Sequence, residues 1–203
     1  MRSVITERDI PAQGELKIAI GAIVTPAARE AASTRGVRLT EVAPDQLSAL
    51  APAEKTVALG SDHGGYWMKE ALKPVFAELG LEVRDVGVHE ETPADYPDIA
   101  ARVAELVASG AATRGVIVDG AGIGSSIAAN KVKGVRAALC YDLASARNSR
   151  EHNDANVLAL GGRLLTPTMA EEVLRVWLRT PFAGGRHAAR VAKIAAIEKR
   201  NFH

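Results

Sequence analysis

The sequence predicts an α/β protein built on a parallel, doubly wound sheet, with a small N-terminal extension. From about residue 55 onward, short apolar runs rich in β-branched residues alternate with amphipathic stretches of helical period. Turns containing glycine separate these segments. The chain has 203 residues, of which 47% are hydrophobic and 24% charged, and this composition can bury a substantial core. We therefore expect helices on both faces of one sheet.

The strands and helices of this sheet follow one another in a regular order. Apolar runs predict strands at residues 57–60, 81–86, 115–118, 136–140 and 156–160. Helical spacing predicts helices at residues 65–79, 96–109, 125–132, 143–151 and 167–179. Gly80 ends the first helix, and one side of that helix carries five apolar residues, Met68, Leu72, Val75, Phe76 and Leu79.

Residues 1–54 form the predicted extension, and residues 55–203 form the main domain. An apolar run at residues 16–24 leads to Thr25-Pro26, where Thr can cap a helix and Pro fits its first turn. This helix would run to Arg35, Gly36 would end it, and residues 37–42 would form a strand. Residues 43–54, which contain Ala and Pro, are predicted to be a linker.

Composition argues against several classes of function. Lys and Arg number 25 against 24 Asp and Glu, so no bulk charge attracts nucleic acid or an anionic membrane. The single cysteine, Cys140, fits a small buried hydrophobe, and the five histidines lack metal-ligand spacing, so we expect no metal. Because no signal sequence and no run of roughly 18 apolar residues is present, we expect a cytoplasmic protein that does not enter a membrane.

The most informative loop follows the predicted strand at residues 115–118. Ligands of doubly wound sheets bind at the carboxyl ends of strands, and here Asp119 is followed by Gly120, Gly122 and Gly124 and then by a helix. Glycines let backbone N–H groups approach an anion, and a helix N-terminus adds positive partial charge. The loop can therefore hold a phosphate or an enediolate oxygen.

A dinucleotide site is an alternative interpretation of this glycine-rich loop. Asp142 follows the next strand, where a ribose partner would lie. Against this interpretation, Ser125 stands at the third glycine position of the dinucleotide fingerprint, and the intervening helix is short.

Asp119 itself has two interpretations. A carboxylate in a loop commonly caps a turn or a helix. At the end of an apolar strand, however, partial burial and neighbouring N–H donors would suit it to remove a proton next to a carbonyl.

Three further clusters carry polar side chains. Asp62 follows the first strand and can orient a hydroxyl or cap a helix, while His63 beside it can bind a phosphate or a hydroxyl. His152 lies in a polar loop and either transfers a proton or has a structural role. Arg186 and Arg190 are four residues apart, so on a helix they form a phosphate clamp or a solvated basic face.

Residues 55–200 resemble the ribose-5-phosphate isomerase B family, which includes the galactose-6-phosphate isomerase subunits. The matching motifs are GSDHGG at 60–65, DYPD at 95–98, GAGIG at 120–124, SIAANK at 126–131, REHNDAN at 150–156, GGR at 161–163 and GGRH at 184–187. The resemblance implies a Rossmann-like fold and interconversion of phosphorylated aldoses and ketoses without a cofactor or a metal. It also implies a homodimer, or a dimer of dimers, with sites at the subunit interface.

The resemblance also implies roles for single residues. By motif match, His152 assists opening of the sugar ring with Asp62 nearby. His63, Arg186 and Arg190 would bind the phosphate. Asn153 and the amides of the glycine turn would stabilise the enediolate, and Tyr96 would line the sugar pocket.

The chain departs from the family pattern at the catalytic base. Many members have a cysteine base where this chain has Asp119, with Thr or Ser in place of Ala121. Another branch has a glutamate base where this chain has Ser125. We expect Asp119 to take over as base, because a carboxylate can remove such a proton and needs no neighbouring hydroxyl to ionise. The expected reaction is ribose 5-phosphate to ribulose 5-phosphate; the alternatives are a tetrose or hexose phosphate, or a binding protein with impaired catalysis.

Residues 21–29 are similar to a short N-terminal module of some enzymes associated with bacterial microcompartments. This similarity implies that the extension contacts shell or cargo proteins and that the enzyme works inside such a compartment. The alternative is a stabilising extension that packs on its own dimer.

Overall fold

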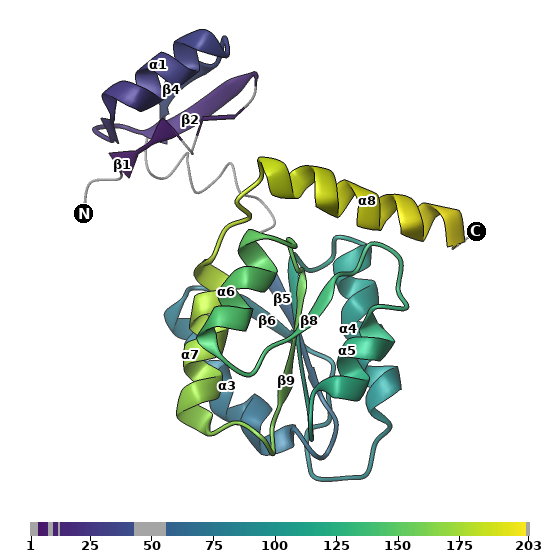
Figure 1. The fold of residues 1–203 in the computed structure, drawn as a ribbon. Helices are drawn as coiled ribbons and strands as arrows, with labels where there is room; N and C mark the ends of the chain where they lie inside the picture. The colour runs from purple at the N-terminus through teal and green to yellow at the C-terminus, as the bar shows by residue number, and fades with distance from the viewer. Residues whose placement is uncertain (1–3, 8–9, 12, 43–55, 202–203) are drawn as a thin grey trace. The chain divides into compact units, whose positions relative to one another are not determined.

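A computed structural model of the chain describes residues 4–7, 10–11, 13–42 and 56–201. The chain divides into two compact units, residues 1–52 and residues 53–203, and each is described by itself (Figure 1). The predicted linker at residues 43–54, with the predicted domain boundary at its end, lies outside the described residues. Within the described ranges, no helix is long and apolar enough to cross a membrane.

The larger unit is built on a parallel sheet with the strand order β6-β5-β7-β9-β8. The three central strands are buried almost throughout, which explains why their sequences are continuous apolar runs rather than alternating patterns. This arrangement confirms the predicted doubly wound sheet. The strands are β5 (Thr56–Ser61), β6 (Glu82–Asp85), β7 (Arg114–Asp119), β8 (Ala137–Leu139) and β9 (Val157–Gly161).

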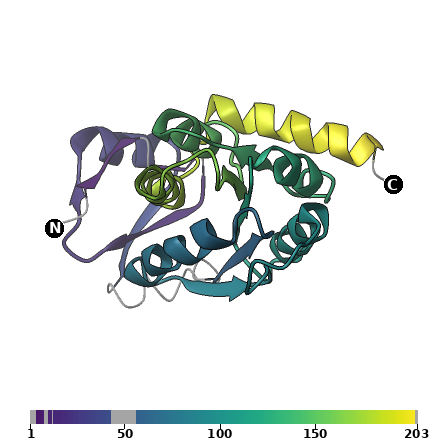
Figure 2. The ribbon, with the colours of Figure 1, turned by 90° about the horizontal axis from the view of Figure 1, so that it is seen from below.

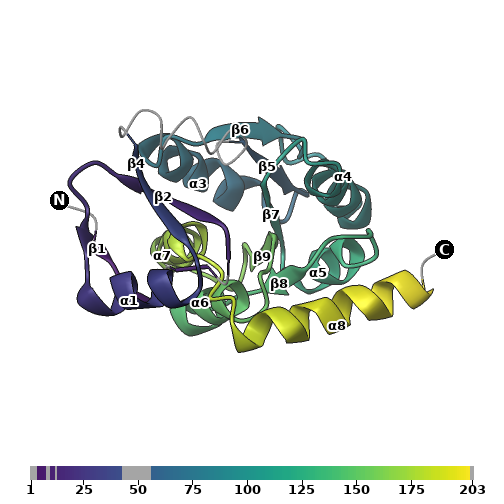
Figure 3. The same ribbon diagram turned by 90° about the horizontal axis from the view of Figure 1, so that it is seen from above.

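Helices cover both faces of this sheet (Figure 3). On one face lie α3 (Tyr66–Glu78), α6 (Leu143–Glu151) and α7 (Pro167–Arg179), and on the other lie α4 (Tyr96–Ala108) and α5 (Ile123–Ala129). Each face has its own hydrophobic core, with Phe76 and Trp177 fully buried in the first and Val103 in the second. At Gly60 a Cβ would lie 2.7 Å from Ile99 Cγ2, so glycine lets α4 pack directly on β5.

A buried ion network joins α3 to β6. Lys69 is 0% exposed, and its Nζ donates to Asp85 Oδ2 at 2.6 Å and to the Val88 carbonyl at 2.8 Å. Lys73 Nζ lies 3.0 Å from the same Asp85 oxygen. Burial raises the pKa of Asp85, but the hydrogen bonds from both lysines outweigh burial and hold the pKa below its ordinary value. The network thus fixes the start of the loop that leads from β6 to α4.

The last helix, α8 (Arg186–Asn201), drawn in yellow on the outside of the larger unit (Figure 2), lies roughly across the strand direction (Figure 1), on the β8 side of the sheet (Figure 3). The Gly134 N–H, just before β8, donates to Glu198 Oε1 at 2.7 Å. His187 is the buried residue of α8, whereas Ile194 and Ile197 are 45% and 53% exposed. An apolar strip of α8 therefore remains uncovered by the described residues of one chain.

The described residues of the smaller unit form two pairs of parallel strands and one helix. β1 (Val4–Ile5) pairs with β3 (Ile23–Val24), and β2 (Glu15–Ala19) pairs with β4 (Arg38–Val42). α1 (Pro26–Thr34) begins as predicted, because Thr25 Oγ1 accepts the Ala28 N–H at 3.3 Å. Gly36 follows the helix with φ +64°, a left-handed conformation that glycine adopts without strain.

Candidate active site

Two carboxylates lie side by side at the carboxyl edge of the sheet. β5 and β7 are neighbours with Ser61 opposite Val118, so Asp62 and Asp119, each one residue further along, leave the sheet together. Both are buried, with 7% and 5% of their surface exposed. Parallel strands bring their carboxyl ends to one edge, so two segments far apart in sequence form one polar cluster there.

The Asp119 carboxylate organises the glycine-rich turn. Oδ1 accepts the N–H groups of Ala121, at 2.8 Å, and of Gly122, while Oδ2 accepts the Ser125 N–H at 3.0 Å. Because these bonds close the turn, α5 begins at Ile123, two residues earlier than predicted. The capping interpretation of Asp119 therefore describes its contacts, while its role as a base stays a prediction.

These contacts also narrow the set of amides that can meet a substrate oxygen. The Gly122 N–H donates to Asp119 Oδ1, so its expected contact with the enediolate stays a prediction and would require this N–H to be shared. Gly122 also supplies the left-handed φ of +79° on which the turn depends. Ile123 and Gly124 are the first two residues of α5, so their N–H groups have no acceptor within the helix. With Gly120, they remain the candidates for an oxyanion site.

Asp62 is electrostatically coupled to Asp119. Burial raises the pKa of Asp62; the hydrogen bond from Gly65 N–H, at 2.9 Å, opposes this effect, and the nearby Asp119 charge adds to it. The two loops touch closely, since a Cβ at Gly64 would lie 3.1 Å from the Gly120 nitrogen. A carboxyl group with a raised pKa can exchange a proton nearer neutral pH than an ordinary aspartate.

Other predicted residues lie at the same edge. A Cβ at Gly124 would approach the Tyr96 ring to 2.4 Å, so the tyrosine covers the start of α5. His63 Nδ1 accepts the Ala94 N–H at 3.3 Å, which leaves the ring proton on Nε2 as a donor for a phosphate or a hydroxyl.

Two residues at this edge carry no role in the sequence prediction. Tyr141 Oη donates to the Ala121 carbonyl at 2.6 Å and braces the glycine turn from the end of β8. A Cβ at Gly120 would lie 3.7 Å from Arg163 Cδ, which brings a cation beside the turn. The GGR motif at residues 161–163 could have indicated that Arg163 lies near the site. No pattern in the sequence predicts the contact between Tyr141 and Ala121.

Asp142, the acid on which the dinucleotide alternative depends, caps α6. Its Oδ1 accepts the Ser145 N–H at 2.6 Å, and the Ser145 side chain returns a bond to the Asp142 backbone. The same hydrogen bonds lower the pKa of the Asp142 carboxyl. Because the Asp142 carboxylate is engaged in capping α6, a role for it in binding a ribose is disfavoured.

A second polar cluster lies at the opposite, amino-terminal edge of the sheet. α6 starts after the carboxyl end of β8 and runs back to Glu151, so His152 and Asn153 follow at the other edge. The Ala183 N–H donates to the Glu151 carbonyl at 3.0 Å, which brings the start of α8 to the same place. The His152 and His187 rings stack there, with centroids 4.1 Å apart and planes 4° apart.

Buried Arg150 holds this second cluster together. Its Nη1 donates to Asp154 Oδ1 at 2.9 Å and to the Ala155 carbonyl at 2.6 Å, and its Nε donates to the Thr180 carbonyl at 3.2 Å. The guanidinium also lies over the Trp177 ring, 5.6 Å from its centroid. Arg150 therefore joins the loop that carries His152 to the segment that leads into α8.

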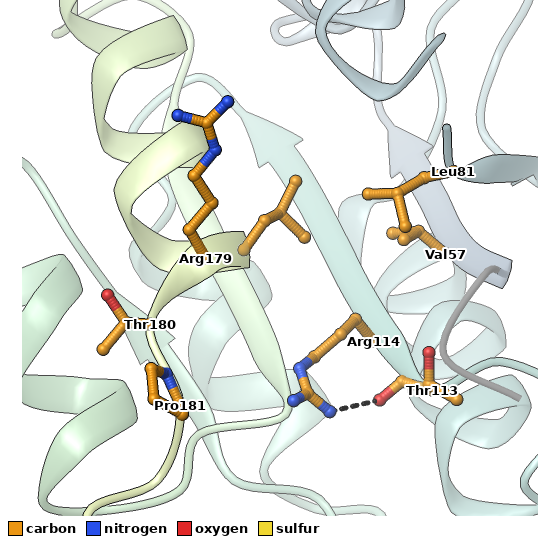
Figure 4. A pocket seen from close by; sticks show the side chains of 8 residues that line it. Val57, Leu81, Thr113, Arg114, Arg179, Thr180 and Pro181 are labelled. Carbon is orange, nitrogen blue, oxygen red and sulfur yellow. Dashed lines mark hydrogen bonds between the residues drawn. The ribbon is translucent and has the colours of Figure 1, made fainter. Parts of the chain in front are cut away.

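The two clusters do not meet within one chain. A cavity of about 210 Å³ marks the amino-terminal edge, where Val57, Thr113 and Arg114 at the starts of β5 and β7 face Thr180 (Figure 4). Asn153 lines another cavity of about 400 Å³ beside Ile194. The expected joint action of His152, Asn153, Arg186 and Arg190 with Asp119 therefore stays a prediction that depends on the subunit interface implied by the resemblance.

Comparison with known proteins identifies the family. Residues 57–194 match the family model described as Ribose/Galactose Isomerase. Ribose-5-phosphate isomerase B of Escherichia coli is 43% identical over 146 residues, which cover 72% of this chain and 98% of the relative. D-erythrulose-4-phosphate isomerase of Pectobacterium atrosepticum is 38% identical over 150 residues, 73% of this chain and 98% of the relative.

A solved structure agrees with these sequence matches. That of ribose-5-phosphate isomerase B from Clostridium thermocellum superposes with a TM-score of 0.70 at 50% identity, covering 71% of this chain and 98% of that one. The resemblance stated from the motifs is thus confirmed, and the five-stranded parallel sheet is the expected Rossmann-like fold. The chain therefore belongs to the ribose/galactose isomerase family, and it is a sugar phosphate isomerase related to ribose-5-phosphate isomerase B.

Proposed function

We propose that the protein interconverts ribose 5-phosphate and ribulose 5-phosphate through an enediolate. The observation that carries this proposal is the pair of buried carboxylates, Asp62 and Asp119, beside the start of α5, where the first two N–H groups have no acceptor within the helix. Removing a proton next to a carbonyl requires a base close to donors that stabilise the charge developing on oxygen. A tetrose phosphate is the second candidate substrate, because one relative carries the name D-erythrulose-4-phosphate isomerase.

The reaction would proceed in two stages. In ring opening, Asp62 takes the proton of the anomeric hydroxyl, the bond from C1 to the ring oxygen breaks, and His152 gives that oxygen a proton. In isomerisation, Asp119 removes the C2 proton, and N–H groups of the glycine turn stabilise the enediolate. The proton then returns to C1, while the proton of the C2 hydroxyl passes to O1, so that C2 becomes the carbonyl carbon and C1 carries the hydroxyl. Asn153 would bind the enediolate, while Tyr96 would line the sugar pocket.

The test is isomerisation of ribose 5-phosphate in deuterated water, with deuterium incorporation as the readout. Proton abstraction by a base that exchanges with solvent introduces deuterium during turnover. If this sugar does not react, tetrose and hexose phosphates are assayed in the same way. If no sugar phosphate is isomerised or incorporates deuterium, while binding depends on the phosphate group, the binding-protein alternative is favoured.

We further propose that the active protein is a homodimer, or a dimer of dimers, in which two copies complete each site. The partner subunit would bring its second cluster, with the Arg186 and Arg190 phosphate clamp, to the carboxyl edge of this chain. The opposite placement of the clusters supports this proposal, as does the exposed apolar surface of Ile127, Ile194 and Ile197, which are 58%, 45% and 53% exposed.

Mixed dimers test this arrangement. Asp119→Asn and His152→Gln are each expected to be inactive alone, because each removes one half of every site. Produced together in one cell, the two variants should recover about a quarter of the wild-type rate, since half of the dimers are mixed and each contains one intact site. Mixing in which no activity returns would show that both residues act from the same chain.

We propose that the N-terminal unit is an assembly element that contacts shell or cargo proteins of a microcompartment. It lies outside the family match at residues 57–194, has its own small core, and exposes Ile20 and Ile23 by 61% and 50%. Removal of residues 1–52 should leave kcat/KM within about twofold, because the larger unit has its own cores. Association with shell proteins, measured by co-purification, should be lost. Unchanged association would contradict the assembly role.

A further inference from the structure

His187 lies directly against the proposed ring-opening histidine. Its ring is parallel to that of His152, with centroids 4.1 Å apart and a 4° angle between the planes. His152 is the C-cap residue of α6, whereas His187 belongs to the first turn of α8, so the contact joins two separate elements. His187 is 9% exposed and is the buried residue of a helix that otherwise faces outward.

A second contact fixes the His152 ring from its own helix. The side-chain amide of Asn148, one turn earlier in α6, places Nδ2 2.8 Å from Nδ1 of His152. His187 therefore covers one face of the His152 ring, and Asn148 binds its Nδ1. The other ring nitrogen, Nε2, remains available to contact the sugar. When the ring gains a proton at Nδ1, rotation of the amide presents Oδ1 as the acceptor.

The surroundings of His187 disfavour a proton on its own ring. Desolvation lowers the pKa of His187, and the neighbouring His152, Arg186 and Arg190 lower it further, while Glu151 opposes them. Two parallel imidazoles at this distance do not both carry a positive charge at low cost. His187 thus serves as the neutral ring of the pair.

We propose that His187 is a positioning residue for sugar-ring opening. Its flat ring packs against His152 and, together with Asn148, holds the His152 ring in place. This inference rests on the proposed function. As the bond between C1 and the ring oxygen O4 breaks, its electron pair stays on O4, which takes the proton from Nε2 of the His152 imidazolium. The proton of the anomeric hydroxyl passes to Asp62, and C1 becomes the aldehyde carbon.

Two reactions of one sugar pair separate ring opening from enediolate chemistry. Ribose 5-phosphate is a furanose that must open before it isomerises. Ribulose 5-phosphate has its O5 esterified and is an open chain, so exchange of its C1 proton with deuterated water requires no ring step. His187→Ala should lower kcat/KM for isomerisation of ribose 5-phosphate by about 10- to 100-fold. The C1 exchange rate of ribulose 5-phosphate should stay within about twofold.

Three further variants distinguish positioning from folding and phosphate binding. His187→Phe, which restores a flat ring, should recover most of the isomerisation rate. Asn148→Ala, at an exposed position on α6, should give the same selective loss as His187→Ala. Arg190→Met should lower both reactions in parallel, because the phosphate is common to both sugars.

The outcomes decide between the inference and the function on which it rests. An equal loss of both reactions in His187→Ala and Asn148→Ala, or no loss in either, would overturn the positioning role. A failure of His187→Phe to recover the rate would also count against it, provided that its thermal unfolding matches the wild type. A wild-type protein that catalyses neither reaction would instead overturn the proposed function.

Discussion

Asp119→Asn is expected to lower the rate of isomerisation and of deuterium exchange by about 10²- to 10⁴-fold, the usual contribution of a general base. The amide has nearly the shape of the carboxylate but has no basic oxygen to accept a carbon-bound proton. Its carbonyl can still accept the N–H groups of Ala121 and Gly122, so the glycine turn is largely kept. Sugar-phosphate binding, measured by calorimetry, should persist.

The same substitution also tests the capping role of Asp119, because the Nδ2 group of the new side chain would face the Ser125 N–H in place of Oδ2. Loss of that bond should lower the free energy of unfolding by about 1–3 kcal/mol. The two effects are measured separately, one by exchange and the other by urea unfolding. A stability loss accompanied by near-wild-type exchange would make Asp119 a structural cap only. Asp62, whose pKa is raised, would then be the next candidate for the base.

Most of the larger unit could be predicted from the sequence, because its central strands and amphipathic helices carry strong periodic signals. The bounds of α6 and α7 agree with the predicted ranges 143–151 and 167–179. In both helices a side chain at the N-cap marks the start, Asp142 in one and Thr166 in the other. The donor and acceptor of such a hydrogen bond are only three residues apart, so the sequence alone can predict the bond.

The start of α5 could not be predicted in the same way. The sequence marks a glycine-rich turn, but the first helical residue depends on which amides the Asp119 carboxylate binds. Those bonds span two to six residues and require the left-handed conformation of Gly122. Asp119 therefore acquires a structural role that spacing and composition could not separate from a catalytic one.

The assembly of the candidate site was also only partly predictable. Loops that follow parallel strands meet at one edge, so the proximity of Asp62 and Asp119 follows from the strand order alone. His152 follows a helix instead, which places it at the other edge. The sequence contains both groups of residues but no local signal for a second copy that would join them. The family resemblance supplied that expectation, and the separation of the clusters within one chain supports it.

Arg150→Met is expected to lower the free energy of unfolding by about 1–3 kcal/mol, the usual cost of leaving buried hydrogen-bond acceptors unsatisfied. The guanidinium is 2% exposed and donates to Asp154 Oδ1 and to the carbonyls of Ala155 and Thr180. Methionine fills similar volume against Trp177 but leaves these acceptors without their donor. The fluorescence of the two tryptophans, Trp67 and Trp177, reports urea unfolding of the larger unit.

Arg175→Met is the matched control for this prediction. Arg175 lies on the outer side of α7 and pairs with Glu78 at 2.6 Å, where the two side chains are 28% and 59% exposed. Water screens such a pair, so its loss should cost only about 0–1 kcal/mol. Equal losses in the two variants would show that burial does not set the contribution of Arg150. A large loss in Arg150→Met alone would show that one buried cation holds the loop carrying His152 to the segment leading to α8.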